Sequence, residues 1–497
     1  MVNQDLTSRS SDPPQRSFKN AIGLMVAQIV VLPVSLVNNA MMARYLGADD
    51  FGKMYLVGTI WTFGILFIEW GQGGTLTAMV SRDRANMGDA LGSGLLWRVS
   101  SGPIVYGVLA VGCAWLGRGR DLQVALALMG GVFGLYTISA AAQDTLRGLE
   151  RMRVPAMAVV AQQVLNLVFM APTLVLGGHL RAVLVAQIAS WFVVAAWVWR
   201  VLRTSTKISL TVHRRTLKAL LSEGTPFLVL NLSLALQPNV DAFMLAKLAP
   251  LESMGWLAAA KKLVGVLIFP VGALATAFYP TWVRLWGENQ EAFRRAVSTG
   301  FRASTVLVAP IALGCAIYPD IGIRAFSRNT FGPAEDDLRL LSLFVLALFF
   351  SMLLGVAITA AGRSRAWAVC QFGCVVVSAV LDPILVPYFQ THHGNGSLGI
   401  CVSTVVSEAF MVAGGMWLVP PGILNRAFAR TVGLTAMAAL AMVATARVLS
   451  HVTPFVAAPV AVAAYAVCLW SIGGVDPALV QIVTDAVGRR FRRSADP

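Results

Sequence analysis

The chain has 497 residues, of which 57% are hydrophobic and only 13% are charged, and its mean hydropathy is +0.70. In soluble proteins roughly a quarter of all residues are charged. The composition therefore indicates a membrane protein and argues against a large soluble catalytic or ATP-hydrolysing domain. The net charge of +15 fits cytoplasmic loops of such a protein better than a nucleic-acid-binding surface.

Apolar segments follow one another along almost the whole chain. Each is close to the length of about 20 residues that a helix needs to cross a bilayer. The sequence therefore predicts an all-α polytopic membrane protein with about 14 transmembrane helices. In chain order the segments are 20–42, 54–79, 95–116, 123–143, 155–177, 182–199, 225–246, 254–280, 300–319, 340–361, 367–388, 398–418, 431–449 and 455–472.

Most of the 39 Lys and Arg residues lie in connections on the same side as the N-terminus. Since cytoplasmic loops are enriched in these residues, the bias predicts that both termini are cytoplasmic and that the number of spans is even.

An internal repeat relates two segments of the chain at a constant offset. Arg44 aligns with Lys247, and at the same offset Asn38 aligns with Asp241. Such duplications are common in transporters. The repeat predicts two related six-helix lobes followed by two C-terminal helices. The expected parts are a polar N-terminus (1–17), an N-lobe (18–199), a basic cytoplasmic linker (200–224), a C-lobe (225–418), the final helix pair (419–473) and a basic cytoplasmic tail (474–497).

Four short motifs carry a family resemblance. Residues 43–55 (ARYLGADDFGKMY) resemble the R-x-L-G-x-x-x-F/Y-G-x-Y signature of the Wzx-type polysaccharide flippases, a branch of the multidrug/oligosaccharidyl-lipid/polysaccharide exporter (MOP) superfamily. Residues 69–71 (EWG), 143–153 (QDTLRGLERMR) and 255–263 (GWLAAAKKL) are similar to later parts of the same pattern. The likeness covers roughly residues 18 to 418.

This resemblance implies a function. Such flippases move undecaprenyl-diphosphate-linked oligosaccharides to the outer face of the bacterial plasma (inner) membrane, for exopolysaccharide, capsule or O-antigen synthesis. The resemblance also implies alternating access to a central cavity between the two lobes. A polysaccharide polymerase and export machinery are the partners that it suggests.

An anionic headgroup needs a cationic, water-filled path through hydrocarbon, so buried cations are candidate binding residues. Lys261 and Lys262 lie inside the eighth segment, and Lys262 is preferred because the family pattern has a cation there. Alternatively, both side chains extend to the interface on their long stems. Arg44 and Lys247 occupy equivalent outer ends of the first and seventh segments, where they either attract the headgroup or stabilise helix ends.

Acidic and amide side chains inside the segments are further candidates. Asp241 and Glu69 could couple transport to H⁺ or Na⁺, or could form fixed ion pairs, for instance Asp241 with Lys262. The amides could line a sugar-binding cavity or form hydrogen bonds between helices. The predicted lining residues are Asn38, Asn39, Gln163, Asn166, Gln237 and Asn239.

Enzyme signatures are absent from the sequence: it has no P-loop, HExxH, GxSxG or Cys/His metal cluster. We therefore expect no enzyme activity, no cofactor and no metal site. Two alternatives to the flippase remain. An ion-coupled exporter of cationic drugs from the same superfamily would have twelve spans or an acidic cavity. A membrane polysaccharide polymerase would have a large outer loop.

Overall fold

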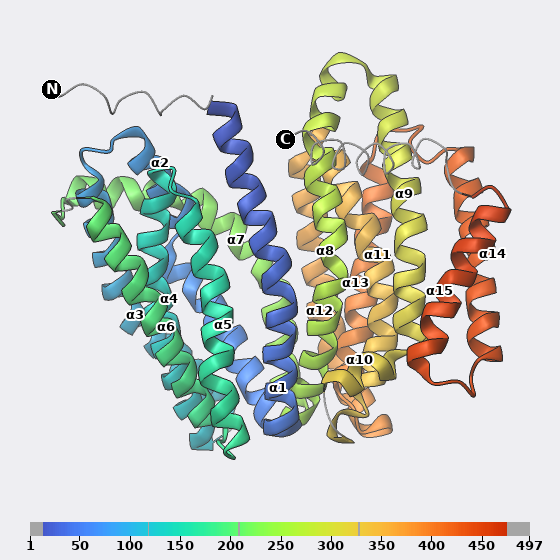
Figure 1. The fold of residues 1–497 in the computed structure, drawn as a ribbon, viewed down its shortest axis with the longest axis horizontal. Coiled ribbons are helices and arrows are strands. Elements are labelled where there is room, and N and C mark those ends of the chain that lie inside the picture. The colour runs from blue at the N-terminus through green and yellow to red at the C-terminus, as the bar shows by residue number, and fades with distance from the viewer. Residues whose placement is uncertain (1–12, 118, 207–208, 327–328, 475–497) are drawn as a thin grey trace, which may run out of the picture. The chain divides into compact units, whose positions relative to one another are not determined.

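The computed structural model describes residues 13–117, 119–206, 209–326 and 329–474. Within these ranges the chain is nearly all α-helical and has no strand, so the predicted all-α class is confirmed (Figure 1). Most of the predicted N-terminal segment 1–17 and nearly all of the predicted tail 474–497 lie outside the described residues.

Contacts divide the chain into two compact units, Met1–Gly255 and Trp256–Pro497. Seven helices lie in the first unit: α1 (Pro13–Glu69), α2 (Gln72–Arg82), α3 (Met87–Trp115), α4 (Gly119–Gly148), α5 (Arg153–Val175), α6 (Leu180–Ser205) and α7 (Arg214–Leu248). The remaining elements are α8 (Leu251–Glu288), which starts in the first unit, and α9 (Gln290–Ile317), α10 (Pro319–Phe326), η1 (Asn329–Phe331), α11 (Ala334–Ala360), α12 (Ser364–His393), α13 (Ser397–Leu418), α14 (Arg426–Val448) and α15 (Pro454–Ser471).

The two units repeat one packing pattern. In the first, α3 packs on α4, α4 on α6 and α5 on α6; in the second, α9 packs on α11, α11 on α13 and α12 on α13. A duplicated chain would give this pattern. In the first unit α7 also packs against α1, α2 and α3. The lobe boundaries given by the sequence analysis stay a prediction.

In the part of the chain that the structure describes, twelve helical stretches are long and apolar enough to cross a membrane, or thirteen if α7, bent by 48° between its two limbs, counts as one span. The chain is therefore a multi-pass membrane protein. One of the twelve stretches, Val30–Arg82, has 53 residues and would measure about 80 Å as one helix, far more than the roughly 30 Å of hydrocarbon. Gly47, with φ 76° and ψ 179°, interrupts it, so it accounts for two of the predicted spans.

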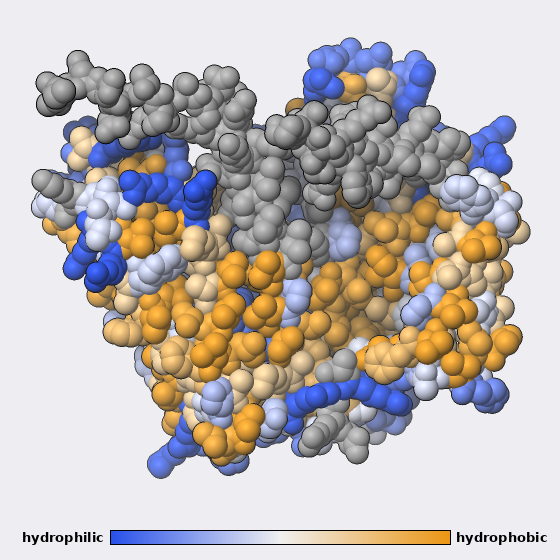
Figure 2. Space-filling view, viewed as in Figure 1, coloured by the Kyte–Doolittle hydropathy of each residue, from blue (hydrophilic) through white to orange (hydrophobic). Residues whose placement is uncertain are grey.

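The surface agrees with this assignment. In each unit hydrophobic side chains cover the middle of the visible face, and hydrophilic ones gather near the helix ends (Figure 2). Such a band matches the hydrocarbon region, where a helix satisfies its own backbone hydrogen bonds.

The repeat is visible in one close backbone contact of the first unit. A Cβ added to Gly52 of α1 would lie 2.1 Å from the carbonyl oxygen of Leu251, at the start of α8. A Cβ added to Gly255 would lie 2.1 Å from the carbonyl oxygen of Ala48. Ala48 and Leu251 have the same separation in the sequence as Gly52 and Gly255, so the contact is symmetric with respect to the repeat. Only glycine allows so close an approach.

Gly52→Ala should therefore destabilise the protein by about 1–3 kcal/mol, because its methyl group would meet backbone that cannot move aside. The loss would be measured as a lower midpoint of thermal unfolding in detergent. Gly58→Ala on the same helix is the control, since its Cβ would contact only the Met129 methyl group, at 3.8 Å. Equal midpoints for the two variants would contradict the assignment of this contact.

Candidate functional site

A buried arginine organises the first unit. Arg98 of α3 has no exposed side-chain surface. Its Nε donates to Oε1 of Gln72 in α2 at 2.9 Å, Nη1 to the carbonyl oxygen of Thr137 at 2.6 Å, and Nη2 to Oδ2 of Asp144 at 3.2 Å. Thr137 and Asp144 both belong to α4. One side chain therefore ties α2, α3 and α4 together.

Asp144 is the shared acceptor of this network. Its side chain is only 4% exposed, and its Oδ1 also accepts a hydrogen bond from Nη1 of Arg147 at 2.9 Å. Removing one partner of a buried ion pair leaves an uncompensated charge and typically costs about 3–5 kcal/mol. The Arg98–Asp144–Arg147 network, with the bond from Arg98 to Gln72, is therefore expected to hold α2, α3 and α4 in one arrangement.

A polar pocket lies beside this network, where α1 ends and α2 begins. Trp70 and Gly71 interrupt the helix with φ angles of 47° and 69°. A side chain at Gly71 would collide with the carbonyl oxygen of Gly224, 2.1 Å from a Cβ. Non-helical backbone at membrane depth is tolerated where it lines protein or water, and here it borders a pocket of about 90 Å³.

Glu69 is the acidic group of this pocket. It lines the pocket together with Asn231 of α7, and it lies close enough to Arg98, Asp144 and Arg147 to interact with their charges. Among the described residues it has no hydrogen-bond partner. The pocket has room for about three water molecules, or for one small cation next to the carboxylate. Glu69 thus lies beside the ion network, and its role in ion coupling or ion pairing stays a prediction.

The sequence analysis did not identify Arg98 as a functional residue, although residue 98 lies in the predicted segment 95–116. The structure starts α3 at Met87 rather than at the predicted residue 95, which places Arg98 about 16 Å into the helix. One usable signal was present in the sequence. Asp144 and Arg147 are three residues apart, a spacing that pairs side chains on a helix.

Asn38 and Gln163, predicted to line a cavity, form an interhelical bond. Nδ2 of Asn38 in α1 donates to the backbone oxygen of Gln163 in α5 at 3.0 Å and to its Oε1 at 3.1 Å. One turn along α5, Oδ1 of Asn166 is buried without a hydrogen bond, and so is Oδ1 of Asn38. The structure thus brings two of the six predicted amide residues, Asn38 and Gln163, together at the α1–α5 contact.

Three further amides, Asn39, Asn239 and Gln237, are dispersed. Nδ2 of Asn39 donates to the carbonyl oxygen of Ser35 at 2.7 Å, and Nδ2 of Asn239 donates to that of Ala235 at 2.7 Å. These two amides bond within their own helices. Gln237 is half-buried on α7.

The predicted cations occupy different settings. Nζ of Lys247 donates to the carbonyl oxygen of Trp115 at 3.1 Å and lies 4.5 Å from the centre of the Trp115 ring, so it caps the end of α3. Arg44 is exposed three residues before the break at Gly47. Lys261 is half-buried on α8 and Lys262 is exposed there. Their roles in substrate binding stay predictions.

Further acids are buried in both units. Asp241 lies on α7 with 2% exposure, and its role in ion coupling stays a prediction. In the second unit, Glu408 accepts a hydrogen bond from Ser351, and Asp337 accepts one from Ser397 at 2.7 Å. Within the described residues, no group of three or more His, Cys, Asp or Glu side chains is placed to hold a metal ion.

Comparison with protein families gives the family of the chain. The model described as polysaccharide biosynthesis protein matches residues 17–286, more than half of the sequence. The chain belongs to this family. A second model, MatE, matches residues 226–384. A search of curated proteins finds no match.

Solved structures share the fold. "Lipid II flippase MurJ, inward closed conformation" is similar with a TM-score of 0.71 and 11% identity, over 94% of this chain and 99% of that chain. An inward-facing multidrug resistance MATE transporter of the MOP superfamily is similar with a TM-score of 0.65 and 16% identity, over 80% and 98%. A MOP superfamily transporter from Pyrococcus furiosus is similar with a TM-score of 0.54 and 16% identity, over 83% and 98%. With the family match, these neighbours confirm the predicted resemblance to MOP superfamily flippases and exporters.

Asp144→Asn tests the buried network. The neutral amide would leave Arg98 and Arg147 without a carboxylate, so we expect a loss of about 3–5 kcal/mol, measured as a lower thermal midpoint in detergent. Glu150→Gln is the control, because Glu150 pairs with Arg84 at 3.1 Å and both side chains are exposed. Exposed pairs contribute at most about 1 kcal/mol. If Asp144→Asn were as stable as Glu150→Gln, the network would not hold these helices.

Proposed function

We propose that this protein is a flippase that moves an undecaprenyl-diphosphate-linked oligosaccharide from the cytoplasmic to the outer face of the bacterial plasma membrane. The repeat unit would serve the synthesis of an exopolysaccharide, capsule or O-antigen. The observation that carries the proposal is the polysaccharide biosynthesis family match over residues 17–286, which extends from α1 almost to the end of α8.

The C-terminal helix pair supports this choice over a drug exporter. The MurJ flippase structure covers 94% of the chain. The remaining 6% of the 497 residues is shorter than α14 and α15 taken together, since these helices have 23 and 18 residues. The likeness must therefore include part of this pair. The MATE structure covers 80% of the chain while using 98% of its own, so it is a shorter protein. A pair of helices beyond the first twelve is what the sequence analysis associated with the flippase.

Lys262 is the proposed substrate-binding cation. It lies about 16 Å from the start of α8, which is about half of the hydrocarbon thickness. A lysine at this depth costs roughly 2.5–3.5 kcal/mol unless it faces water or a counter-ion. Its side chain is exposed and has no hydrogen-bond partner among the described residues. A water-filled path that carries an anionic diphosphate would supply both water and counter-ion.

The proposal also covers ion coupling, the location of the termini and the partner proteins. Uptake of H⁺ or Na⁺ by Asp241, which is buried in α7, would couple transport to an ion gradient. Both termini would lie in the cytoplasm. A polysaccharide polymerase and export machinery would act on the translocated unit.

The MatE match over residues 226–384 favours a second candidate, an ion-coupled exporter of cationic compounds.

Lys262→Ala should abolish polymer export while the protein still reaches the membrane, because the diphosphate would lose its cation. Lys262→Arg keeps the charge and should largely retain export. Export would be scored in cells as surface polymer, with membrane levels of each variant measured in parallel. Normal export by Lys262→Ala would remove this lysine from the mechanism.

Transport in proteoliposomes separates the two candidate functions. The flippase predicts that an undecaprenyl-diphosphate oligosaccharide becomes accessible on the opposite face while a cationic dye does not move. Movement of the dye alone would instead establish the exporter.

A further inference from the structure

The first unit contains an apolar pocket whose lining includes no residue of the Arg98–Asp144–Arg147 network. It has a volume of about 330 Å³ and lies where α1, α3 and α7 meet. Its polar side chains include Thr59 and Asn239. The Thr59 hydroxyl donates to the carbonyl oxygen of Tyr55 at 2.9 Å, and the Asn239 amide donates to that of Ala235 at 2.7 Å. Each group therefore uses a hydrogen-bond donor within its own helix.

The pocket suits a hydrocarbon occupant. A buried water needs two to four polar partners, whereas an apolar cavity of about 150 Å³ stays dry and binds benzene. At more than twice that volume, this pocket has room for about a dozen carbon atoms. An undecaprenyl chain is several times longer and would leave most of its length outside. A segment of one fatty acyl chain fits.

The pocket opens on a surface that suits lipid. Val108 of α3 lines the pocket and is 67% exposed. Val111 and Trp115 follow on the same helix and are also exposed. Exposed apolar side chains on a membrane-spanning helix face acyl chains. An acyl chain can therefore enter from the bilayer without crossing water.

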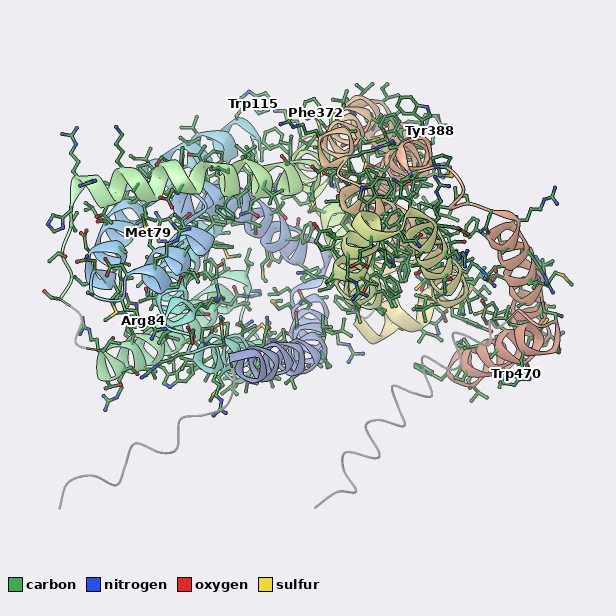
Figure 3. The ribbon with its side chains drawn as sticks, turned by 90° about the horizontal axis from the view of Figure 1, so that it is seen from above. Met79, Arg84, Trp115, Phe372, Tyr388 and Trp470 are labelled. Atoms are coloured by element: carbon green, nitrogen blue, oxygen red, sulfur yellow. The ribbon has the colours of Figure 1, made fainter. Side chains whose placement is uncertain are left out.

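A cation and an aromatic ring lie at one end of this pocket. Phe243 lines it and stacks on Trp115, with the ring centres 5.7 Å apart. Lys247 follows one turn later on α7, exposed, and uses one of its three donors on the Trp115 carbonyl. Figure 3 shows Trp115 at the edge of the unit beside α7. Tryptophan and lysine are typical of the membrane interface, where a lipid phosphate lies.

We propose that this pocket binds one acyl chain of an anionic phospholipid of the surrounding membrane, with the lipid phosphate on Lys247. Phospholipids are favoured because they are the abundant chain-bearing molecules around α3. The α7 residues that line the pocket all lie in the second limb of this helix, Ala235–Leu248, after its 48° bend. The lipid therefore supports this limb against α1 and α3. This inference is independent of the proposed function.

Gly112→Leu is the test of the pocket. Gly112 lines it, and a Cβ there would meet no atom within 4 Å, so leucine fills the space that the acyl chain needs. Gly107→Leu is the matched control, because Gly107 lies on the same helix with equally open space and does not line the pocket. Binding of phosphatidylglycerol to the purified, delipidated protein would be measured by native mass spectrometry and by the rise in thermal midpoint.

We expect the wild type and Gly107→Leu to bind phosphatidylglycerol alike and Gly112→Leu to bind it at least about tenfold more weakly, a loss of roughly 1.4 kcal/mol. Equal binding by Gly112→Leu, or equal loss in both variants, would overturn the assignment of the pocket.

Lys247→Gln tests the headgroup contact and decides the question even if Gly112→Leu does not fold. The wild type should prefer phosphatidylglycerol to phosphatidylcholine by about tenfold, and Lys247→Gln should lose this preference. An unchanged preference would overturn the phosphate contact. Undecaprenyl phosphate is the competing probe, and if it displaced phosphatidylglycerol from the wild type but not from Gly112→Leu, the occupant would be an isoprenoid lipid and the phospholipid assignment would be wrong.

Discussion

Hydrocarbon provides no hydrogen-bond partners, and this constraint governs the whole structure. Every backbone amide in a span must bond within the chain, so the described residues form helices, and the breaks have local causes. Gly47 adopts φ 76° between two membrane-spanning stretches, and Trp70 and Gly71 interrupt the helix beside a polar pocket. The same constraint makes a buried charge expensive unless it is paired. Arg98 meets this requirement with bonds to two neighbouring helices.

Pairing of buried charges also separates residues that hold helices together from residues that the proposed transport could use. Arg98 and Asp144 satisfy each other, which fits a fixed framework. Glu69 borders that framework without a hydrogen bond among the described residues, and exposed Lys262 likewise has none. A charge that must exchange partners during transport needs such freedom, whereas a charge that holds helices together does not. Lys247 has a backbone partner at Trp115, which fits a residue at the interface.

Close packing between helices depends on small side chains, since hydrocarbon gives no hydrophobic drive for helices to associate. At Gly52 and Gly255 the backbones touch, and the contact obeys the internal repeat. Elsewhere in the first unit packing is looser. The pocket between α1, α3 and α7 is large enough for a segment of one fatty acyl chain. Tight and loose contacts within one unit are what the proposed alternating access would require.

The sequence by itself determined the all-α class, the multi-pass membrane character and the family resemblance, because these depend on local hydropathy and on short motifs such as residues 43–55. Hydropathy records which residues enter the membrane. Only the tertiary structure decided which buried side chains meet. Arg98 lies 46 residues from Asp144, and Asn38 lies 125 residues from Gln163. Helices of similar hydropathy can pack in many rotations about their axes, and the direction in which a polar side chain points depends on that rotation.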